Sequence, residues 1–90
     1  TYRSPDSSMP ARYARAIAQY RLGQFAQALD QVDLLLEDHP KDPYFYELKG
    51  QILFESGEID RAVAPLQTAS SLRANSPLIK IMLAHALIER

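Results

Sequence analysis

The 90-residue chain contains no cysteine and no tryptophan. Without cysteine, it has no disulfide, no thiolate zinc site and no cysteine nucleophile. Its 10 basic and 11 acidic side chains give a formal net charge of −1. It therefore lacks the excess of Lys and Arg with which dedicated nucleic-acid-binding proteins contact phosphates. No apolar run approaches the roughly 20 residues of a membrane-spanning helix. We expect neither a nucleic-acid partner nor a membrane span.

Side-chain sets that perform catalysis are also missing from the sequence. The three glycines form no phosphate-binding loop, and Ser70 and Ser71 fall near the predicted end of a helix, away from any strained nucleophile turn. His39 lies in "EDHPKD" beside Asp38 and Asp42. Because zinc sites need three or four convergent ligands, we interpret this stretch as a solvated loop. We expect no catalytic, metal-binding or cofactor-binding residue in this chain.

Short breaks divide the chain into five segments with helical periodicity. Ser8, Asp42 and Ser76 are suited to cap helices that have proline in the first turn, where proline is tolerated. Pro65 falls inside a regular apolar pattern, so we expect it to bend its helix without ending it. Residues 1–8 are polar and aperiodic, which indicates a tail or linker. The predicted helices span residues 9–22, 25–38, 43–56, 59–72 and 77–90.

One ten-residue pattern occurs twice in the chain. "YRLGQFAQAL", which begins at Tyr20, recurs in related form as "FESGEIDRAV" 34 residues later. Three small residues with the same spacing, Ala16, Gly50 and Ala84, are expected to lie where two helices approach closely. Because one helix pair cannot bury its apolar face alone, a period of this length indicates helix pairs stacked on one another.

These repeated positions resemble the tetratricopeptide repeat, a 34-residue helix–turn–helix unit with small, aromatic and alanine positions. The resemblance implies an all-α fold, an α-α superhelix of five helices that forms one domain over residues 9–90. The implied domain contains two full repeats, residues 9–42 and 43–76, and the first helix of a third repeat, residues 77–90.

The first helix departs from the family pattern at its interior positions. It carries Arg12, Arg15 and Gln19 where apolar residues are usual. Burying two unpaired guanidinium groups would cost too much free energy. We therefore expect this helix to cap the stack, with the arginine stems lying over the repeat and the charged groups in water.

A second, narrower resemblance concerns "ARYARAIAQYRLGQ" and "PYFYELKGQILFESGEIDRAVAPL". These stretches are similar to the repeat region that follows the catalytic domain in bacterial, envelope-located HExxH zinc metalloproteases. The resemblance implies that the chain is a non-catalytic fragment of a zinc peptidase, in the bacterial periplasm or cell envelope. The parent's catalytic domain would then be one partner, and zinc would belong to that domain because this chain has no HExxH.

The family resemblance also implies a binding face, because the first helix of each repeat lines a concave groove. By register with the three small residues, the groove positions are Tyr13, Ile17, Tyr20, Tyr44, Glu47, Gln51, Phe54, Ile81 and His85. The positions that hold a terminal carboxylate in some relatives carry no cation here, so we expect no such clamp. An apolar, aromatic face of this kind favours a module that binds a protein or peptide, as an extended or helical apolar segment.

Two assignments on this face remain open at the level of sequence. Tyr13, Ile17 and Tyr20 recur at i, i+4 and i+7, which suits either the core or the groove. His85 suits either an exposed helix position or a polar contact in the groove. In the second repeat, Tyr44 and Phe54 are assigned to the groove on the expectation that Tyr46 and Leu53 already fill the interior.

The last helix supports an alternative function, structural self-association as a homodimer. Its apolar residues spread around more than one face, so some must be exposed in a monomer: Leu78, Ile79, Ile81, Met82, Leu83 and Ile88. Helix stacks that lack a polar cap tend to associate with each other.

Overall fold

The computed structural model describes residues 8–89, and every secondary-structure element in that range is an α-helix. The helices are α1 (Met9–Arg21), α2 (Phe25–Asp38), α3 (Pro43–Glu55), α4 (Ile59–Leu72) and α5 (Pro77–Glu89). Each agrees with its predicted span to within one residue at either end. The predicted tail lies outside the described residues except for Ser8, which precedes α1.

Three of the helices begin at the capping residues that the sequence predicts. The Ser8 side chain accepts a hydrogen bond from a backbone N–H in the first turn of α1, at 3.4 Å. Asp42 does the same for α3 at 2.9 Å, and Ser76 for α5 at 3.3 Å. Each side chain satisfies one of the N–H groups that have no partner inside the helix.

Gly23 and Gly57 form the same turn in the two full repeats. Their φ angles are +79° and +89°, a left-handed conformation that glycine adopts without a steric penalty. In each turn the backbone N–H of the next residue donates to a carbonyl five positions earlier, at 2.8 Å in both copies. This Schellman-type ending explains why the ten-residue pattern repeats around the two glycines.

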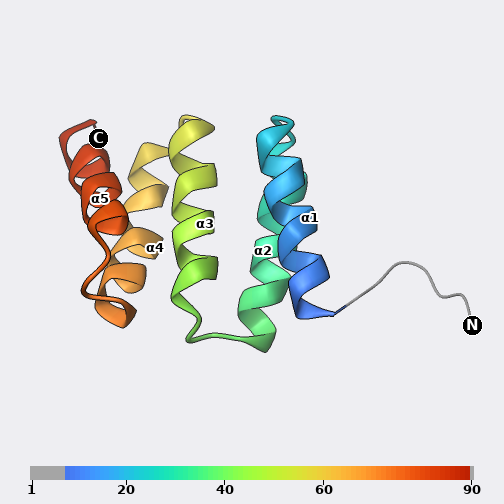
Figure 1. Cartoon of the computed structure of the whole chain (residues 1–90). Coiled ribbons are helices and arrows are strands. Elements are labelled where there is room, and N and C mark those ends of the chain that lie inside the picture. Colours follow the sequence, from blue (N-terminus) through green and yellow to red (C-terminus); the bar gives the residue numbers. More distant parts are fainter. Residues whose placement is uncertain (1–7, 90) are drawn as a thin grey trace, which may run out of the picture.

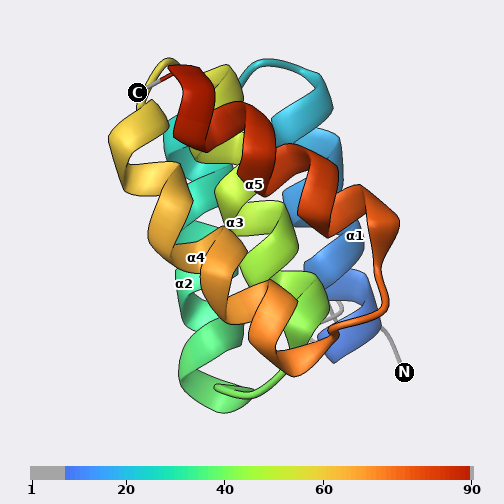
Figure 2. The same cartoon turned by 90° about the vertical axis from the view of Figure 1, so that its left-hand side faces the viewer.

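The five helices form a stack in which sequence neighbours pack on each other. Figure 1 shows α1, α3 and α5 at the front and α2 and α4 behind them. Figure 2 looks along the stack, with α5 nearest the viewer and α1 and α2 farthest away. The three odd-numbered helices, which the sequence placed on the groove, therefore share one face of the molecule.

The core contains two apolar clusters, the first between α1, α2 and α3 and the second between α3, α4 and α5. Leu29 of α2 packs against both clusters and so links the repeats. The buried members of the first cluster are Ala16, Ala28, Val32, Leu48 and Ile52. Those of the second are Leu53, Ala62, Val63, Leu66 and Ala86. α2 and α4 supply apolar residues at three- and four-residue steps to these clusters, in agreement with the helical periodicity of their sequences.

Gly50 lies where α3 meets α4. A Cβ atom at this position would lie 2.5 Å from Cγ of Leu66, which is fully buried. Ala16, the equivalent residue in the first repeat, is also fully buried. The prediction for Ala84 is wrong, because this residue is exposed and no helix within residues 8–89 follows α5 to cover it.

The arginine-bearing face of α1 differs from the prediction that its charges lie in water. Arg12 Nη1 lies 2.7 Å from Asp38 Oδ2, and its side chain is only 19% exposed. The ion pair forms because α2 ends beside the start of α1 and presents a carboxylate there. Arg15 is partly buried, and Gln19 Oε1 is buried without a hydrogen-bond partner in the described part of the chain.

In α3, the residue that fills the interior is Phe45, which is 1% exposed. The prediction had assigned this role to Tyr46, which is only partly buried. The Tyr46 hydroxyl donates to the carbonyl of Pro40 at 2.7 Å, and this bond holds the ring near the loop before α3. Leu53, the other predicted interior residue, is buried as expected.

Candidate functional site

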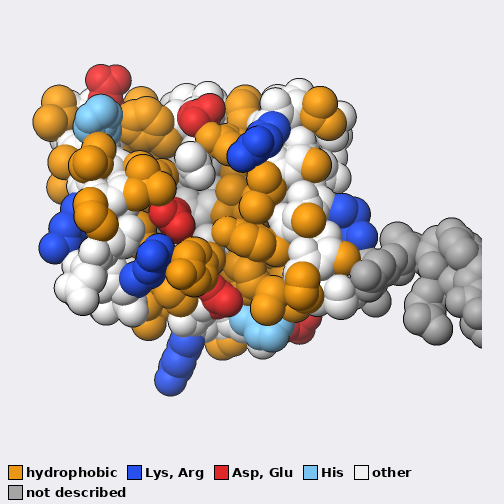
Figure 3. All heavy atoms as spheres, viewed as in Figure 1, with side chains coloured by type: hydrophobic (Ala, Val, Ile, Leu, Met, Phe, Trp, Pro, Cys, Tyr) orange, Lys and Arg blue, Asp and Glu red, His pale blue; other side chains and the backbone are white. Residues whose placement is uncertain are grey.

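The face formed by α1, α3 and α5 contains two adjacent hollows, one on each side of α3. Hydrophobic side chains form a band between α1 and α3 and a second group over α5 (Figure 3). The α3–α5 hollow is lined by Gln51, Phe54, Glu55, Leu78, Ile81, Met82 and His85. The α1–α3 hollow is lined by Tyr13, Ile17, Tyr20, Arg21, Glu47, Leu48 and Gln51.

The α3–α5 hollow has a largely apolar wall and a volume of about 250 Å³. Phe54 packs against the second core cluster, and so does Met82 of α5. Leu78 and Ile81 stand at the rim and are 54% and 55% exposed. His85 is exposed at the same hollow, which agrees with both interpretations of this residue. Large apolar side chains are thus held by the core on one side and open to solvent on the other.

The α1–α3 hollow is smaller and more polar. Tyr13, Ile17 and Tyr20 are partly buried, pack against the first core cluster and also line this hollow. The stripe therefore belongs to the core and to the surface at once, which explains why its spacing fits both assignments. The Tyr13 ring lies 5.2 Å from the ring of Phe45, centroid to centroid. Burial, followed by the nearby Glu47 carboxylate, raises the pKa of Tyr13.

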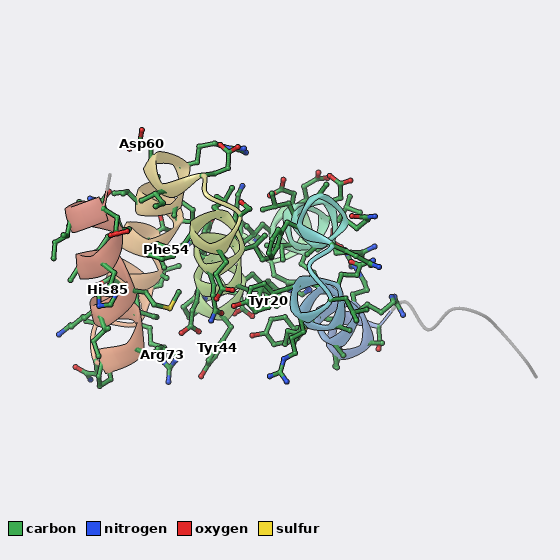
Figure 4. The ribbon with its side chains drawn as sticks, turned by 90° about the horizontal axis from the view of Figure 1, so that it is seen from above. Tyr20, Tyr44, Phe54, Asp60, Arg73 and His85 are labelled. Carbon is green, nitrogen blue, oxygen red and sulfur yellow. The ribbon has the colours of Figure 1, made fainter. Side chains whose placement is uncertain are left out.

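A hydrogen bond joins α1 to α3 between the two hollows. Tyr20 points from α1 toward α3, and its hydroxyl donates to Glu55 Oε2 at 2.5 Å (Figure 4). Burial first, and then the hydrogen bond to Glu55, raise the pKa of Tyr20 to about 12. The bond keeps the Glu55 carboxylate engaged with the protein itself.

Glu47, one turn before Gln51, is a partly buried carboxylate that lines the α1–α3 hollow. It makes no hydrogen bond or ion pair with any residue of the described part, 8–89. Burial raises its pKa, and the positive charge of Arg73 partly opposes this effect. The Arg73 guanidinium is instead stacked on the ring of Tyr44, 4.7 Å from the ring centroid (Figure 4).

Eight of the nine predicted groove residues line one of the two hollows, and Gln51 lines both. Tyr44 lines neither hollow, because it stands 46% exposed under Arg73. Sequence reasoning missed four further lining residues: Arg21, Leu48, Glu55 and Met82. Glu55 follows Gln51 by four residues, so helical spacing would have been enough to place it on the same face. That the nine predicted groove residues bind a partner stays a prediction.

The described residues offer no site for a metal ion. Within residues 8–89, no three His, Asp or Glu side chains are grouped closely enough to hold one. His39 packs against Phe45, with 5.9 Å between the ring centroids. None of the helices within residues 8–89 has the length and the apolar character that a membrane-spanning helix requires.

Comparisons with known proteins agree with this architecture. The family model of the tetratricopeptide repeat matches residues 13–77. Among solved structures, the chain is similar to the Yersinia enterocolitica type III secretion translocator chaperone SycD, in an alternative dimer. The TM-score is 0.87 with 18% sequence identity, over 98% of this chain and 67% of that chain. At this identity the likeness shows the fold alone. No curated protein sequence matches the chain.

Proposed function

Because the chain belongs to the tetratricopeptide repeat family, we propose that it is a non-catalytic module that binds a protein segment along the face of α1, α3 and α5. The single observation that best supports this proposal is the α3–α5 hollow. Leu78 and Ile81 are exposed at its rim, and Phe54 and Met82 also line it. Covering such side chains releases about 25 cal/mol per Å² of apolar surface, which favours an apolar partner.

Two matched variants test the proposal without disturbing the core. Ile81→Ser removes a 55%-exposed apolar side chain from the rim of the hollow. Leu34→Ser removes a 49%-exposed side chain from α2, outside both hollows. Circular dichroism should show the same helicity for both variants as for the unmodified chain.

The binding measurement uses a phage-displayed library of random peptides. The unmodified chain and Leu34→Ser should enrich peptides rich in Leu, Ile, Phe and Met, and Ile81→Ser should lose that enrichment. Equal enrichment by Ile81→Ser and Leu34→Ser would exclude the hollow as the binding site. No enrichment by the unmodified chain would reject peptide binding on this face.

Exposure on α5 favours self-association as a second candidate function. Leu87 and Ile88 are 42% and 80% exposed, and Ala84 beside them is exposed as well. In the second repeat, the residue equivalent to Ala84 is Gly50, which lies under Leu66 of the following helix. A helix from a second copy could cover α5 in the same way. Sedimentation equilibrium should then show a dimer that Ile88→Glu converts to a monomer, and a monomer at all concentrations would reject this function.

The origin of the chain in an envelope-located bacterial zinc metalloprotease is retained as a separate proposal. It rests only on the two stretches that are similar to the repeat regions of such enzymes. Reading the gene upstream of Thr1 tests it directly. An HExxH motif there supports a parent peptidase whose catalytic domain is one partner, and an open reading frame without it rejects this origin.

A further inference from the structure

We propose that Glu47 selects a partner segment in which a Lys or Arg side chain lies close to the apolar residue held by the α3–α5 hollow. This inference rests on the proposed function, because it assigns chemistry to the partner of the same face. The cation would enter the α1–α3 hollow and pair with the Glu47 carboxylate. The partner would thus be a basic, apolar segment of another protein.

The environment of Glu47 carries the inference. Its carboxylate is partly removed from water, with the rings and stems of α1 on one side, and has no hydrogen bond or ion pair within residues 8–89. Burial of an unpaired charge costs free energy that a bound cation would restore. The raised pKa of Glu47 is consistent with this loss of hydration.

No Lys or Arg side chain within residues 8–89 forms an ion pair with Glu47. The positive charge of Arg73 lowers the pKa of Glu47, but its guanidinium stacks on Tyr44 and forms no ion pair with Glu47. Arg21 also lines the α1–α3 hollow, yet it is exposed and remains hydrated at the C-terminal end of α1. An exposed charge gains little from a partner, whereas a partly buried one gains more.

The register of α3 gives the spacing that the partner needs. Glu47 precedes Phe54 by seven residues, which is about 10 Å along a helix that rises about 1.5 Å per residue. An extended segment advances about 3.3 Å per residue, so its cation should lie about three positions from its apolar anchor. Gln51 lies between the two, lines both hollows and offers an amide to the segment's backbone.

The experiment repeats the peptide-library selection with Glu47→Gln, which keeps the shape and hydrogen-bonding capacity of the side chain and removes its charge. The unmodified chain should enrich peptides with Lys or Arg about three residues from an apolar residue. Glu47→Gln should keep the apolar preference and lose the basic one. Ile81→Ser should lose the apolar preference, and with it all enrichment.

The strongest peptide from the unmodified chain then gives a quantitative test by fluorescence anisotropy. Replacing its basic residue with Gln should weaken binding to the unmodified chain about tenfold, and should not change binding to Glu47→Gln. Apolar enrichment without a basic preference, or a basic preference that survives in Glu47→Gln, overturns the role of Glu47 and leaves the groove proposal standing. Enrichment of acidic peptides also overturns it, since that result points to Arg21. No enrichment at all overturns both proposals.

Discussion

The two full repeats have the same backbone plan but hold their helices together by different means. In the second repeat α3 meets α4 through Gly50, which lies directly under the buried side chain of Leu66. In the first repeat α1 meets α2 through Ala16 in the core and through the ion pair of Arg12 with Asp38 at the rim.

The difference shows which features the 34-residue period determines. Each repeat begins with a side-chain cap and turns at a left-handed glycine, because these features depend on backbone geometry, which repeats with the sequence. Side chains between the helices need only fill the space and satisfy their polar atoms, so they vary. We infer that the second repeat is the more tightly packed half, because Gly50 meets Leu66 so closely, and that the first is the weaker, because the buried Gln19 oxygen has no hydrogen-bond partner among residues 8–89.

The largest expected effect follows from the close contact of Gly50 with α4. In Gly50→Val the Cβ atom would fall 2.5 Å from Leu66 Cγ, and the buried side chain has little room to move. Overpacking of this kind costs about 3 kcal/mol of the free energy of unfolding. Urea denaturation followed by circular dichroism measures it.

Ala84→Val is the matched control, because Ala84 occupies the equivalent position but is exposed. It should change the free energy of unfolding by less than about 0.5 kcal/mol. Combining Gly50→Val with Leu66→Ala should cost less than the sum of the two single changes, because the second change makes room for the first. Equal costs for Gly50→Val and Ala84→Val would show that the α3–α4 contact is not specially tight.

Whether the sequence alone predicts a feature depends on how far apart in the chain the interacting residues lie. The turn glycines, the caps and the helix ends follow from local chemistry, and all were predictable. The face shared by α1, α3 and α5 followed from helical register. The partners of Arg12 and Tyr44 were not predictable, because Asp38 and Arg73 are each more than 25 residues away and no spacing rule links them. Phe45 is buried in place of Tyr46 because its ring packs against Tyr13 and His39, which lie on other segments, so helical periodicity alone did not reveal it.

The second prediction concerns the turns that the two repeats share. Gly23→Ala and Gly57→Ala place a Cβ on a left-handed residue, although no neighbour lies within 4 Å of either Cβ. The cost is therefore conformational, about 1–2 kcal/mol in each case. Thermal unfolding should give similar losses for both, and Asn in place of Ala should reduce each loss because Asn tolerates this conformation better. A clear inequality between the two alanine variants would mean that the turns differ in the support they receive.

The third prediction concerns the bond between the repeats, from Tyr20 to Glu55. The pKa of Tyr20 is raised to about 12 from its ordinary value of 10.0, so the protonated hydroxyl stabilises the fold. This contribution is complete below about pH 10 and is lost as the pH rises through about 12. Ultraviolet titration, with Tyr20→Phe as the reference, should show a tyrosine that ionises near pH 12, and Glu55→Gln should lower that value. If Tyr20 instead ionises at its ordinary pKa, the hydrogen bond from Tyr20 to Glu55 does not link the two repeats.

The smallest expected effect concerns the ion pair between Arg12 and Asp38 in the first repeat. The hydrogen bond from Arg12 lowers the pKa of Asp38, while the loss of hydration opposes the shift. The stabilisation is therefore present above the ordinary carboxyl pKa of 3.8 and is lost as the pH falls through the lowered value. Carbon NMR should find Asp38 titrating below its usual range, and Arg12→Met, which keeps the apolar stem, should raise the pKa of Asp38 toward its ordinary value. Arg15→Met is the matched control and should leave the pKa of Asp38 unchanged.

Because Asp38 is exposed, added salt should weaken the lowering of its pKa in the unmodified chain. If Asp38 titrates normally there, α1 is held to α2 by packing alone, as α3 is to α4, and the two repeats differ only in the size of the side chains between their helices.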